Sequence, residues 1–495
     1  MREAYRVETV RTAERALMAI VPDGTLMQRA AAGLASACTA ILQRTPGHVY
    51  GAAVTLLVGT GDNGGDALYA GALLARRGAR VTAIAPGKAH EGGLAALLQA
   101  GGRLADSTGA VVAGTDADLI IDGLLGIGGS GGLREPFAAL AAAAAASGAT
   151  TVAVDLPSGI DADTGAVDGP AITADVTITF GAIKPGLLID PGASHAGAVH
   201  LIGLGLDFST AQPAVLAPQH DDISALLPRP GAESDKYRRG VLGVLAGSDR
   251  FGGAAVLATG GAIRGGAGMV RVVTSEQAAP AVREHWPEAV ISGYGTEPGR
   301  VQAWVAGPGM GVTDDARTRL RDVLRADVPV LVDADGLTLL TQLRAELQAR
   351  TAPTLITPHS GELGRLLQAD PADIEAHRLD YAIRAAAELN VTVLLKGSTT
   401  VIASPGDAAA RVNSTGTPWL ATAGSGDVLS GLAGALLAQG LSTADAAMAA
   451  AYLHGLAGRL AADGAPIGAG DIIDALPAAI RTVTENRRAS GNLRQ

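Results

Sequence analysis

Short apolar runs recur along the chain, and each ends in glycine or a polar residue and precedes an Ala- and Leu-rich stretch. Continuous apolar runs of this kind are typical of parallel strands that helices cover on both faces. The first half contains candidate strands at residues 53–58, 81–85, 119–122, 152–155, 176–180 and 200–204. The second half contains them at residues 241–246, 270–273, 304–306, 330–333, 354–357 and 391–395. The pattern predicts an α/β fold in each half.

Between the halves the composition and the periodicity of the sequence change. Residues 207–236 hold four prolines and show little periodicity. A chain of 495 residues is also long enough for two or three domains. We therefore place a boundary near residue 215 and expect domains at residues 1–215 and 216–490.

Composition excludes several classes of protein. The net charge is −10, from 38 Lys and Arg against 48 Asp and Glu, which argues against broad binding to nucleic acid or to acidic membranes. The single cysteine, Cys38, excludes an internal disulfide and any Cys-based metal cluster. No signal-peptide pattern is present, and the Ala run at 138–146 is too short to span a bilayer. We expect a cytoplasmic protein and, from its Ala-rich helical faces, a homo-oligomer.

A glycine-rich segment, Thr60-Gly61-Asp62-Asn63-Gly64-Gly65-Asp66, follows the first of these candidate strands. Glycines let the backbone approach a phosphate, and a helix N-terminus offers free N–H groups to it. The alternative is a tight strand-to-helix turn that binds nothing. Asn63 and Asp66 favour a binding role, because a plain turn does not need a carboxylate at this place.

Two further strand ends carry aspartates. Asp122 leads into the segment Gly126-Ile127-Gly128-Gly129-Ser130-Gly131-Gly132, and Asp155 leads into Leu156-Pro157-Ser158. Ligands of open parallel sheets bind at the carboxyl ends of the strands, so these groups could converge on one crevice with Asn63. Oxygen ligands without a Cys or His cluster suit a hard cation. Lys184 follows another strand and is either a proton donor, a phosphate contact or a solvated surface lysine.

The second half carries two candidate phosphate motifs. In Gly424-Ser425-Gly426-Asp427 a helix start would point its N–H groups at a transferring phosphoryl group, with Asp427 placed as a base. The alternative role for Asp427 is that of an N-cap. The segment Lys396-Gly397-Ser398-Thr399-Thr400 either cradles nucleotide phosphates or forms a β-hairpin turn.

Taken together, the motifs of the first half resemble the NAD(P)HX epimerase domain of the YjeF family over about residues 5–210. They are the Asn-Gly-Gly-Asp segment, the Asp-x3-Gly-x-Gly loop, Val-Asp-Leu-Pro-Ser-Gly-Ile-Asp and Lys-Pro-Gly-Leu. The resemblance implies a Rossmann-like three-layer αβα domain that interconverts the R and S epimers at C6 of hydrated NADH or NADPH. Asp155 and Lys184 are then the acid–base candidates, and K+ is held by Asn63, Asp122 and Ser158. The residues expected around the substrate are Asp62, Asn63, Gly64, Gly65, Asp66, Gly126, Ile127, Gly128, Gly129, Ser130, Gly131, Gly132 and Asp155.

The second half resembles the ADP-dependent NAD(P)H-hydrate dehydratase domain, a ribokinase-like α/β fold, over about residues 221–485. Besides the two phosphate motifs, the match includes Asp235 to Gly240, Phe251 to Ala255, Ala262 to Val270, Gly307 to Gly311, Asp333 to Asp335 and Thr357 to Glu362. The resemblance implies that ADP, with Mg2+, phosphorylates the C6 hydroxyl after Asp427 removes its proton, and that phosphate is then eliminated. Substrate contacts would be Ala254, Gly311, His359 and Asp427, and nucleotide contacts would be Lys396, Gly397, Ser398, Thr399, Thr400 and Gly426.

The sequence departs from the epimerase pattern at three places: Asp62 stands where Asn is usual, Ala67 where Gly is usual, and Met27-Gln28-Arg29-Ala30-Ala31 where Met-Glu-Arg-Ala-Gly is usual. A bifunctional repair enzyme for NADHX and NADPHX is the leading hypothesis. One alternative is a ribokinase-like small-molecule kinase, which would leave a stable phosphorylated product. Another is a first half that senses nucleotides without catalysis.

Overall fold

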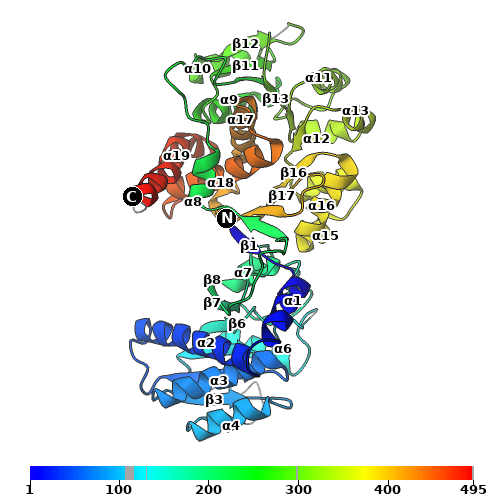
Figure 1. Ribbon diagram of the computed structural model, residues 1–495. Helices are drawn as coiled ribbons and strands as arrows, with labels where there is room; N and C mark the ends of the chain where they lie inside the picture. Colours follow the sequence, from blue (N-terminus) through cyan, green and yellow to red (C-terminus); the bar gives the residue numbers. More distant parts are fainter. Residues whose placement is uncertain (106–115, 130, 297–298, 493–495) are drawn as a thin grey trace. The chain divides into compact units, whose positions relative to one another are not determined.

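The computed structural model describes residues 1–105, 116–129, 131–296 and 299–492, and Figure 1 shows its helices and strands. The chain divides into two compact units. One contains residues 3–215, and the other contains the chain from residue 216 onward together with Met1 and Arg2. Each unit is built around its own sheet.

Every strand pair in the sheet of the N-terminal unit is parallel, in the order β4-β3-β2-β5-β6-β7-β8. The six strands expected from the apolar runs are all present, within about two residues of their predicted bounds. The strands are β2 (Ala53–Val58), β3 (Arg80–Ile84), β4 (Arg103–Ala105), β5 (Leu119–Gly123), β6 (Thr150–Val154), β7 (Val176–Phe180) and β8 (Ala198–Ile202).

Helices cover both faces of this sheet, and the sequence shows why. Leu56 and Ile121 pack with α2 and α3 on one face, whereas their neighbours Leu57 and Ile120 pack with α6 on the other. Alternate residues of one strand therefore enter different cores, and this confirms the predicted three-layer αβα arrangement. The helical elements are α1 (Val7–Met18), α2 (Thr25–Arg44), α3 (Asp62–Arg76), α4 (Glu91–Gln99), α6 (Phe137–Ser147), the 3-10 turn η1 (Pro185–Leu187) and α7 (Gly192–Ala196).

The sheet of the C-terminal unit has the order β1-β9-β18-β17-β16-β15-β14-β13-β10-β11-β12. From β16 to β12 the neighbouring strands are parallel, and β17 and β18 turn the sheet antiparallel at one side. The strands are β1 (Arg2–Ala4), β9 (Val215–Ala217), β10 (Val241–Leu245), β11 (Met269–Thr274), β12 (Val290–Gly293), β13 (Ala303–Ala306), β14 (Val330–Val332), β15 (Thr354–Ile356), β16 (Thr392–Leu395), β17 (Thr400–Ala403) and β18 (Ala410–Asn413).

The main core of this unit lies between the sheet and four Ala-rich helices, α9, α17, α18 and α19. Small side chains let these helices approach closely, as at Gly431, where a Cβ would lie 2.0 Å from the carbonyl oxygen of Ala258. The helices are α8 (His220–Leu226), α9 (Gly252–Arg264), α10 (Ala279–His285), α11 (Asp314–Leu324), α12 (Asp335–Leu340), α13 (Arg344–Gln348), α14 (Ser360–Leu367), α15 (Pro371–Ala376), α16 (Arg378–Leu389), α17 (Ser425–Ala438), α18 (Thr443–Ala462) and α19 (Ala469–Asn492), with the 3-10 turn η2 (Pro418–Leu420).

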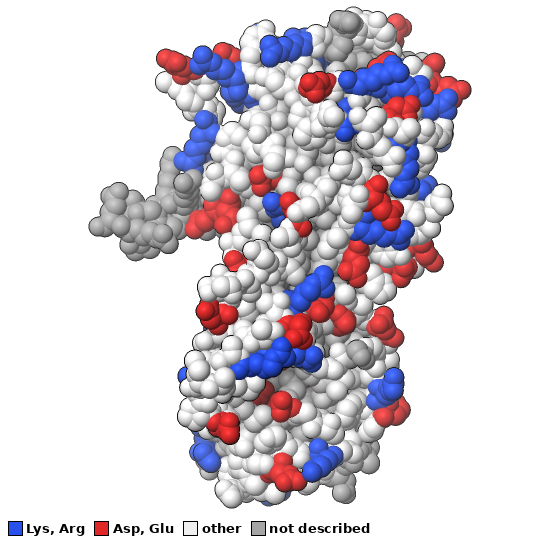
Figure 2. Space-filling model, turned by 45° about the vertical axis from the view of Figure 1, so that its right-hand side comes forward, with Lys and Arg blue, Asp and Glu red and all other residues white. Residues whose placement is uncertain are grey.

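The surface carries charges of both signs. On the face shown in Figure 2, Lys and Arg side chains are interspersed with Asp and Glu side chains. Among the described residues, no helix combines the length and the apolar character needed to cross a membrane.

Candidate active sites

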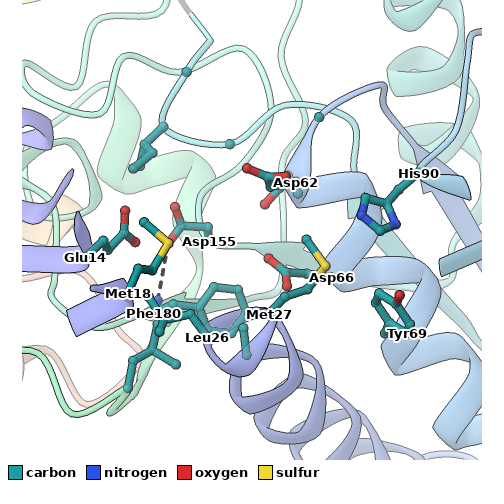
Figure 3. A pocket seen from close by; sticks show the side chains of 18 of the residues that line it. Glu14, Met18, Leu26, Met27, Asp62, Asp66, Tyr69, His90, Asp155 and Phe180 are labelled. Atoms are coloured by element: carbon teal, nitrogen blue, oxygen red, sulfur yellow. Dashed lines mark hydrogen bonds between the residues drawn. The ribbon is translucent and has the colours of Figure 1, made fainter. Parts of the chain in front are cut away.

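A pocket of about 830 Å³ opens in the N-terminal unit, where β2, β5 and β6 reach their carboxyl ends (Figure 3). The predicted crevice is present in part, since Asn63, Asp155 and the loop that begins at Gly126 line it, whereas the buried Asp122 does not. The helix α1 and the start of α2 supply further lining, which the sequence motifs did not indicate. These lining residues include Arg11, Glu14, Arg15, Met18, Leu26 and Met27.

The glycine-rich segment after β2 is already helical. Asp62 is the first residue of α3, and Gly61 is its N-cap. A Cβ at Gly64 would lie 2.3 Å from the carbonyl oxygen of Gly59, so glycine is needed there for the helix to pack on the strand end. Gly64 and Gly65 are buried, whereas the side chains of Asp62 and Asp66 line the pocket.

One part of the second glycine segment lines the pocket, and another part packs within the fold. Gly126, Ile127, Gly128 and Gly129 line the pocket. Gly131 has a positive φ of 71°, and Gly132 packs so closely on Gly169 that a Cβ would lie 2.5 Å from its Cα. Ser130, which is also expected near the substrate, lies outside the described residues.

Asp155 and Lys184 form a buried ion pair. Lys184 Nζ lies 2.5 Å from Asp155 Oδ1, and only 1% of the Lys184 side chain is exposed, so it is not a solvated surface lysine. The same ammonium group donates to Thr179 Oγ1 and to the carbonyl oxygen of Phe180. Asp155 itself has a left-handed backbone with φ of 68°, which turns the chain at the end of β6 and leaves the residue lining the pocket. A buried carboxylate held by a cation therefore lies at the wall of this pocket.

The pocket gathers carboxyl groups. Burial raises the pKa of Asp66 to about 8, and the carboxylates of Asp155, Asp62 and Glu14 push it the same way. One oxygen of Asp66 is buried without a hydrogen-bond partner among the described residues. Figure 3 shows Glu14, Asp62, Asp66 and Asp155 around the same cavity, with Tyr69 and His90 at another part of its wall. Asp66 therefore keeps its proton to a higher pH than an exposed aspartate does.

Asp122 lies fully buried at the end of β5. Its carboxylate accepts hydrogen bonds from the backbone and hydroxyl of Ser158 and from the backbone N–H of Leu124. Burial raises its pKa to about 6, partly offset by these hydrogen bonds. Asn63 is also buried, and its amide Nδ2 has no partner among the described residues. The three residues predicted to hold K+ are thus all buried polar groups of the N-terminal unit.

A second cluster forms in the C-terminal unit, at the carboxyl ends of neighbouring strands. Gly307 to Gly311 follow β13, Asp333 follows β14, His359 lies just beyond β15, and Lys396 follows β16. Parallel pairing of these strands brings the segments to one edge of the sheet.

Asp427 is the third residue of α17, and Gly424, with φ of 86°, is the residue that caps this helix. The N-cap alternative for Asp427 is therefore wrong. Burial raises the pKa of Asp427 to about 7; the Asp333 charge raises it further and the Lys396 ammonium lowers it. A carboxyl group tuned close to neutrality suits general base catalysis.

The predicted nucleotide segment 396–400 is also the turn of a hairpin, because β16 and β17 are antiparallel neighbours. Lys396 turns inward and donates to Asp333 at 2.8 Å, with Glu362 at 3.7 Å. Gly397 packs against the buried Arg378, and Gly397 and Ser398 are exposed. Thr399 is buried and Thr400 begins β17. Gly426 is the last of the predicted nucleotide contacts, and a Cβ added to it would lie 3.5 Å from Lys396 Nζ.

The predicted substrate contacts of this unit occupy neighbouring turns. Gly311, with φ of 77°, donates its backbone N–H to Asp335 at 2.9 Å. Ala254 packs against Gly309: a Cβ added to Gly309 would lie 2.8 Å from the Cβ of Ala254. His359 is the N-cap of α14 and accepts through Nδ1 from the N–H of Gly361. More than half of the His359 side chain stays exposed, and its other ring nitrogen lies 3.7 Å from Glu362 Oε1.

Sequence reasoning missed one buried histidine. His454 on α18 contacts the carbonyl oxygen of Ser425 at 3.0 Å through Nε2, and burial lowers its pKa to about 4. It therefore packs as a neutral ring against the first residue of α17. A lone histidine in an Ala-rich helix was the available signal, but no motif connects it to the Gly424–Asp427 segment.

Comparison with known proteins identifies the family. A family model described as NAD(P)H-hydrate dehydratase matches residues 242–477, and one described as YjeF-related protein N-terminus matches residues 23–186. A Mycobacterium leprae protein named bifunctional NAD(P)H-hydrate repair enzyme Nnr is 47% identical over 474 residues, which cover 95% of this chain and 96% of that protein. This chain belongs to the bifunctional NAD(P)H-hydrate repair enzyme family.

Other relatives of the repair enzyme family agree with this assignment. The protein of the same name from Mycobacterium tuberculosis is 47% identical over 449 residues, 90% of this chain and 91% of its own length. Among solved structures, a ribokinase-like superfamily protein from Enterococcus faecalis covers 54% of this chain and 96% of its own, with a TM-score of 0.50 and 27% identity. The resemblance of both halves and the ribokinase-like fold of the second are thereby confirmed.

Proposed function

We propose that the two units catalyse successive repair steps on hydrated NADH and NADPH. The N-terminal unit interconverts the R and S epimers at C6, and the C-terminal unit dehydrates the S epimer at the expense of ADP. One observation supports this assignment above all. Each unit has its own ion pair between a lysine and a buried carboxylate, Lys184–Asp155 or Lys396–Asp333, at the carboxyl ends of its own parallel strands.

In the epimerase site Asp155 acts as the base, and Lys184 holds it in position. Of the residues expected around the hydrated nicotinamide nucleotide, Asp62, Asn63, Asp66 and Gly126 to Gly129 line the pocket that receives it. The pocket volume of about 830 Å³ is in the range of small-molecule and cofactor sites. Asp62 adds a negative charge beside an anionic ligand, which disfavours tight binding of the phosphates at that point.

K+ is the expected ion of this unit, and Asn63, Asp122 and Ser158 fit it by their chemistry. They offer amide, carboxylate and hydroxyl oxygens, the donor type that hard cations prefer. Asp122 is fully buried and has no ion pair with a described residue. A bound K+ would supply the positive charge that this carboxylate lacks.

In the dehydratase site Asp427 takes the proton of the C6 hydroxyl, which attacks the β-phosphorus of ADP. The β-phosphoryl group moves to that oxygen and AMP leaves. Elimination of phosphate, with loss of a proton from C5, restores the dihydronicotinamide. Lys396 to Thr400 and Gly426 contact the nucleotide, which enters with Mg2+ as its counter-ion, and Ala254, Gly311 and His359 contact the substrate.

Separate assays of the two steps test the proposal. Pure S-NADHX with ADP and Mg2+ should regain the absorbance of NADH. Pure R-NADHX without a nucleotide should give the S epimer. Chromatography that separates the two epimers follows this conversion. A phosphorylated product that accumulates would favour the small-molecule kinase, and dehydration without epimerisation would favour a silent first half. A cytoplasmic location and self-association stay predictions from the sequence.

A further inference from the structure

Asp155 presents one occupied and one free oxygen. Its Oδ1 atom accepts from Thr179 Oγ1 at 3.1 Å, from the N–H of Phe180 at 3.2 Å and from Lys184 Nζ at 2.5 Å. Its Oδ2 atom has no hydrogen-bond partner among the described residues, and Asp155 lines the pocket. Three donors on one oxygen, one of them a cation, suit a carboxylate whose free oxygen accepts a proton from the substrate.

A base alone cannot invert C6. When it removes the proton of the C6 hydroxyl, the C6–N1 bond breaks as the C6=O bond forms, and N1 leaves with the electron pair. That nitrogen needs a proton. Lys184 is an unsuitable donor because its ammonium group is already bound to Asp155, Thr179 and the carbonyl oxygen of Phe180. Another acid must therefore face the ring.

Glu14 is placed to be this acid. It lies on α1, ahead of the residues that the family model of this unit matches, and it lines the pocket. Figure 3 shows its side chain beside that of Asp155. Its carboxyl group has no hydrogen bond or ion pair with a described residue, so it is available to a ligand.

Burial favours a protonated Glu14, and the surrounding charges act on it in both directions. Burial raises the pKa of Glu14; Lys184 opposes this shift, Asp155 reinforces it, Arg11 opposes it and Asp62 reinforces it. Asp66 belongs to the same set of charges, because the Glu14 charge helps to raise the pKa of Asp66. The carboxyl group consequently keeps its proton to a higher pH than an exposed glutamate does.

We propose that Glu14 is a catalytic residue of the epimerase and donates its proton to N1 as Asp155 Oδ2 takes the proton of the C6 hydroxyl. The ring opens to an aldehyde, and rotation about C5–C6 exchanges its faces. On closure N1 attacks C6 and returns its proton to Glu14, while the new oxyanion takes the proton from Asp155. The cycle consumes nothing, and it rests on the proposed epimerase function.

The test compares Glu14→Gln with Glu8→Gln in the full chain. Both substitutions remove one carboxylate from α1, but Glu8 is exposed and does not line the pocket. Epimerisation of R-NADHX without nucleotide is measured from pH 5 to pH 9, and thermal unfolding checks the fold. Glu14→Gln should lower kcat about 100-fold with KM within about twofold. Glu14→Gln should also abolish the alkaline limb of the pH profile, in which wild-type activity falls as Glu14 ionises. Glu14→Asp, which keeps a carboxyl group, should restore part of the rate.

Three results would overturn the proposal. The first is a Glu14→Gln variant with the wild-type kcat and pH profile. The second is an alkaline limb that persists in this variant and disappears in Asp66→Asn, which would make Asp66 the acid. The third is a wild-type chain that dehydrates S-NADHX but does not epimerise R-NADHX, which would remove the proposed epimerase function itself.

Discussion

The Nζ atom of Lys396 lies 2.8 Å from one oxygen of Asp333, and the hydroxyl of Ser430 donates to the other oxygen at 2.7 Å. The buried carboxylate thus links β14, the β16–β17 hairpin and α17. Asp427 stands one helical turn before Ser430, and the Asp333 and Lys396 charges act on it with opposite signs. The network therefore adjusts the pKa of the proposed base, which burial has already raised.

Asp427→Asn should lower the dehydratase kcat by at least about 100-fold, since an amide cannot accept the hydroxyl proton. In the wild-type chain the same step should fail as the pH drops below about 7, because Asp427 becomes protonated there. Rates of NADH formation from S-NADHX between pH 5.5 and pH 8.5 measure both effects. A variant with wild-type rates would exclude Asp427 as the base.

Lys396→Met should move the acid limb of the dehydratase profile to higher pH. The ammonium group lowers the pKa of Asp427, so its loss raises that pKa, and a higher pH is then needed to ionise the base. Lys88→Met is the control, because Lys88 is exposed and belongs to the N-terminal unit. An acid limb that stays in place, in a folded variant, would argue against this role for Lys396.

Lys184→Met should abolish epimerisation and lower the free energy of unfolding of the N-terminal unit by about 3–5 kcal/mol, the usual cost of leaving one partner of a buried pair unpaired. Chemical denaturation measures this loss. The double variant Lys184→Met/Asp155→Leu should regain part of the stability but none of the epimerase activity, since it buries no charge. Equal stability of the single and double variants would contradict the buried-pair account.

Replacing K+ by choline should lower the thermal unfolding temperature of the N-terminal unit together with its epimerase rate. An ion held at about 100 times its dissociation constant stabilises a fold by about 2.7 kcal/mol. Asp122→Asn should remove the difference between the two salts, because it removes the carboxylate proposed to bind the ion. Identical unfolding in K+ and choline would argue against the assignment of Asn63, Asp122 and Ser158.

The pattern of apolar runs was sufficient to predict the parallel strands apart from the edge strands β4 and β12, because buried parallel strands are marked by continuous apolar runs. It did not predict β17 and β18, whose short segments carry no such mark. Motifs also brought Asp155 and Lys184 into one hypothesis, but not their contact, which depends on the positive φ of Asp155.

Other features of the sites depend on tertiary packing alone. Glu14 and Arg11 lie on an ordinary amphipathic helix, and only the packing of α1 brings them to the pocket. Likewise, no local pattern shows that Lys396 pairs with Asp333, since 63 residues separate them. A sequence motif specifies which groups are present, and the fold decides which of them meet.

The most direct test of two independent sites is recovery of NADH absorbance from an R/S mixture of NADHX with ADP, Mg2+ and K+. Asp155→Asn alone should recover only the S portion, and Asp427→Asn alone should recover nothing while still interconverting the epimers. Equal amounts of the two variants should together recover the whole mixture. If the combined variants recover no more than Asp155→Asn alone, or if Asp427→Asn also loses epimerisation while folded, the two-site account is wrong.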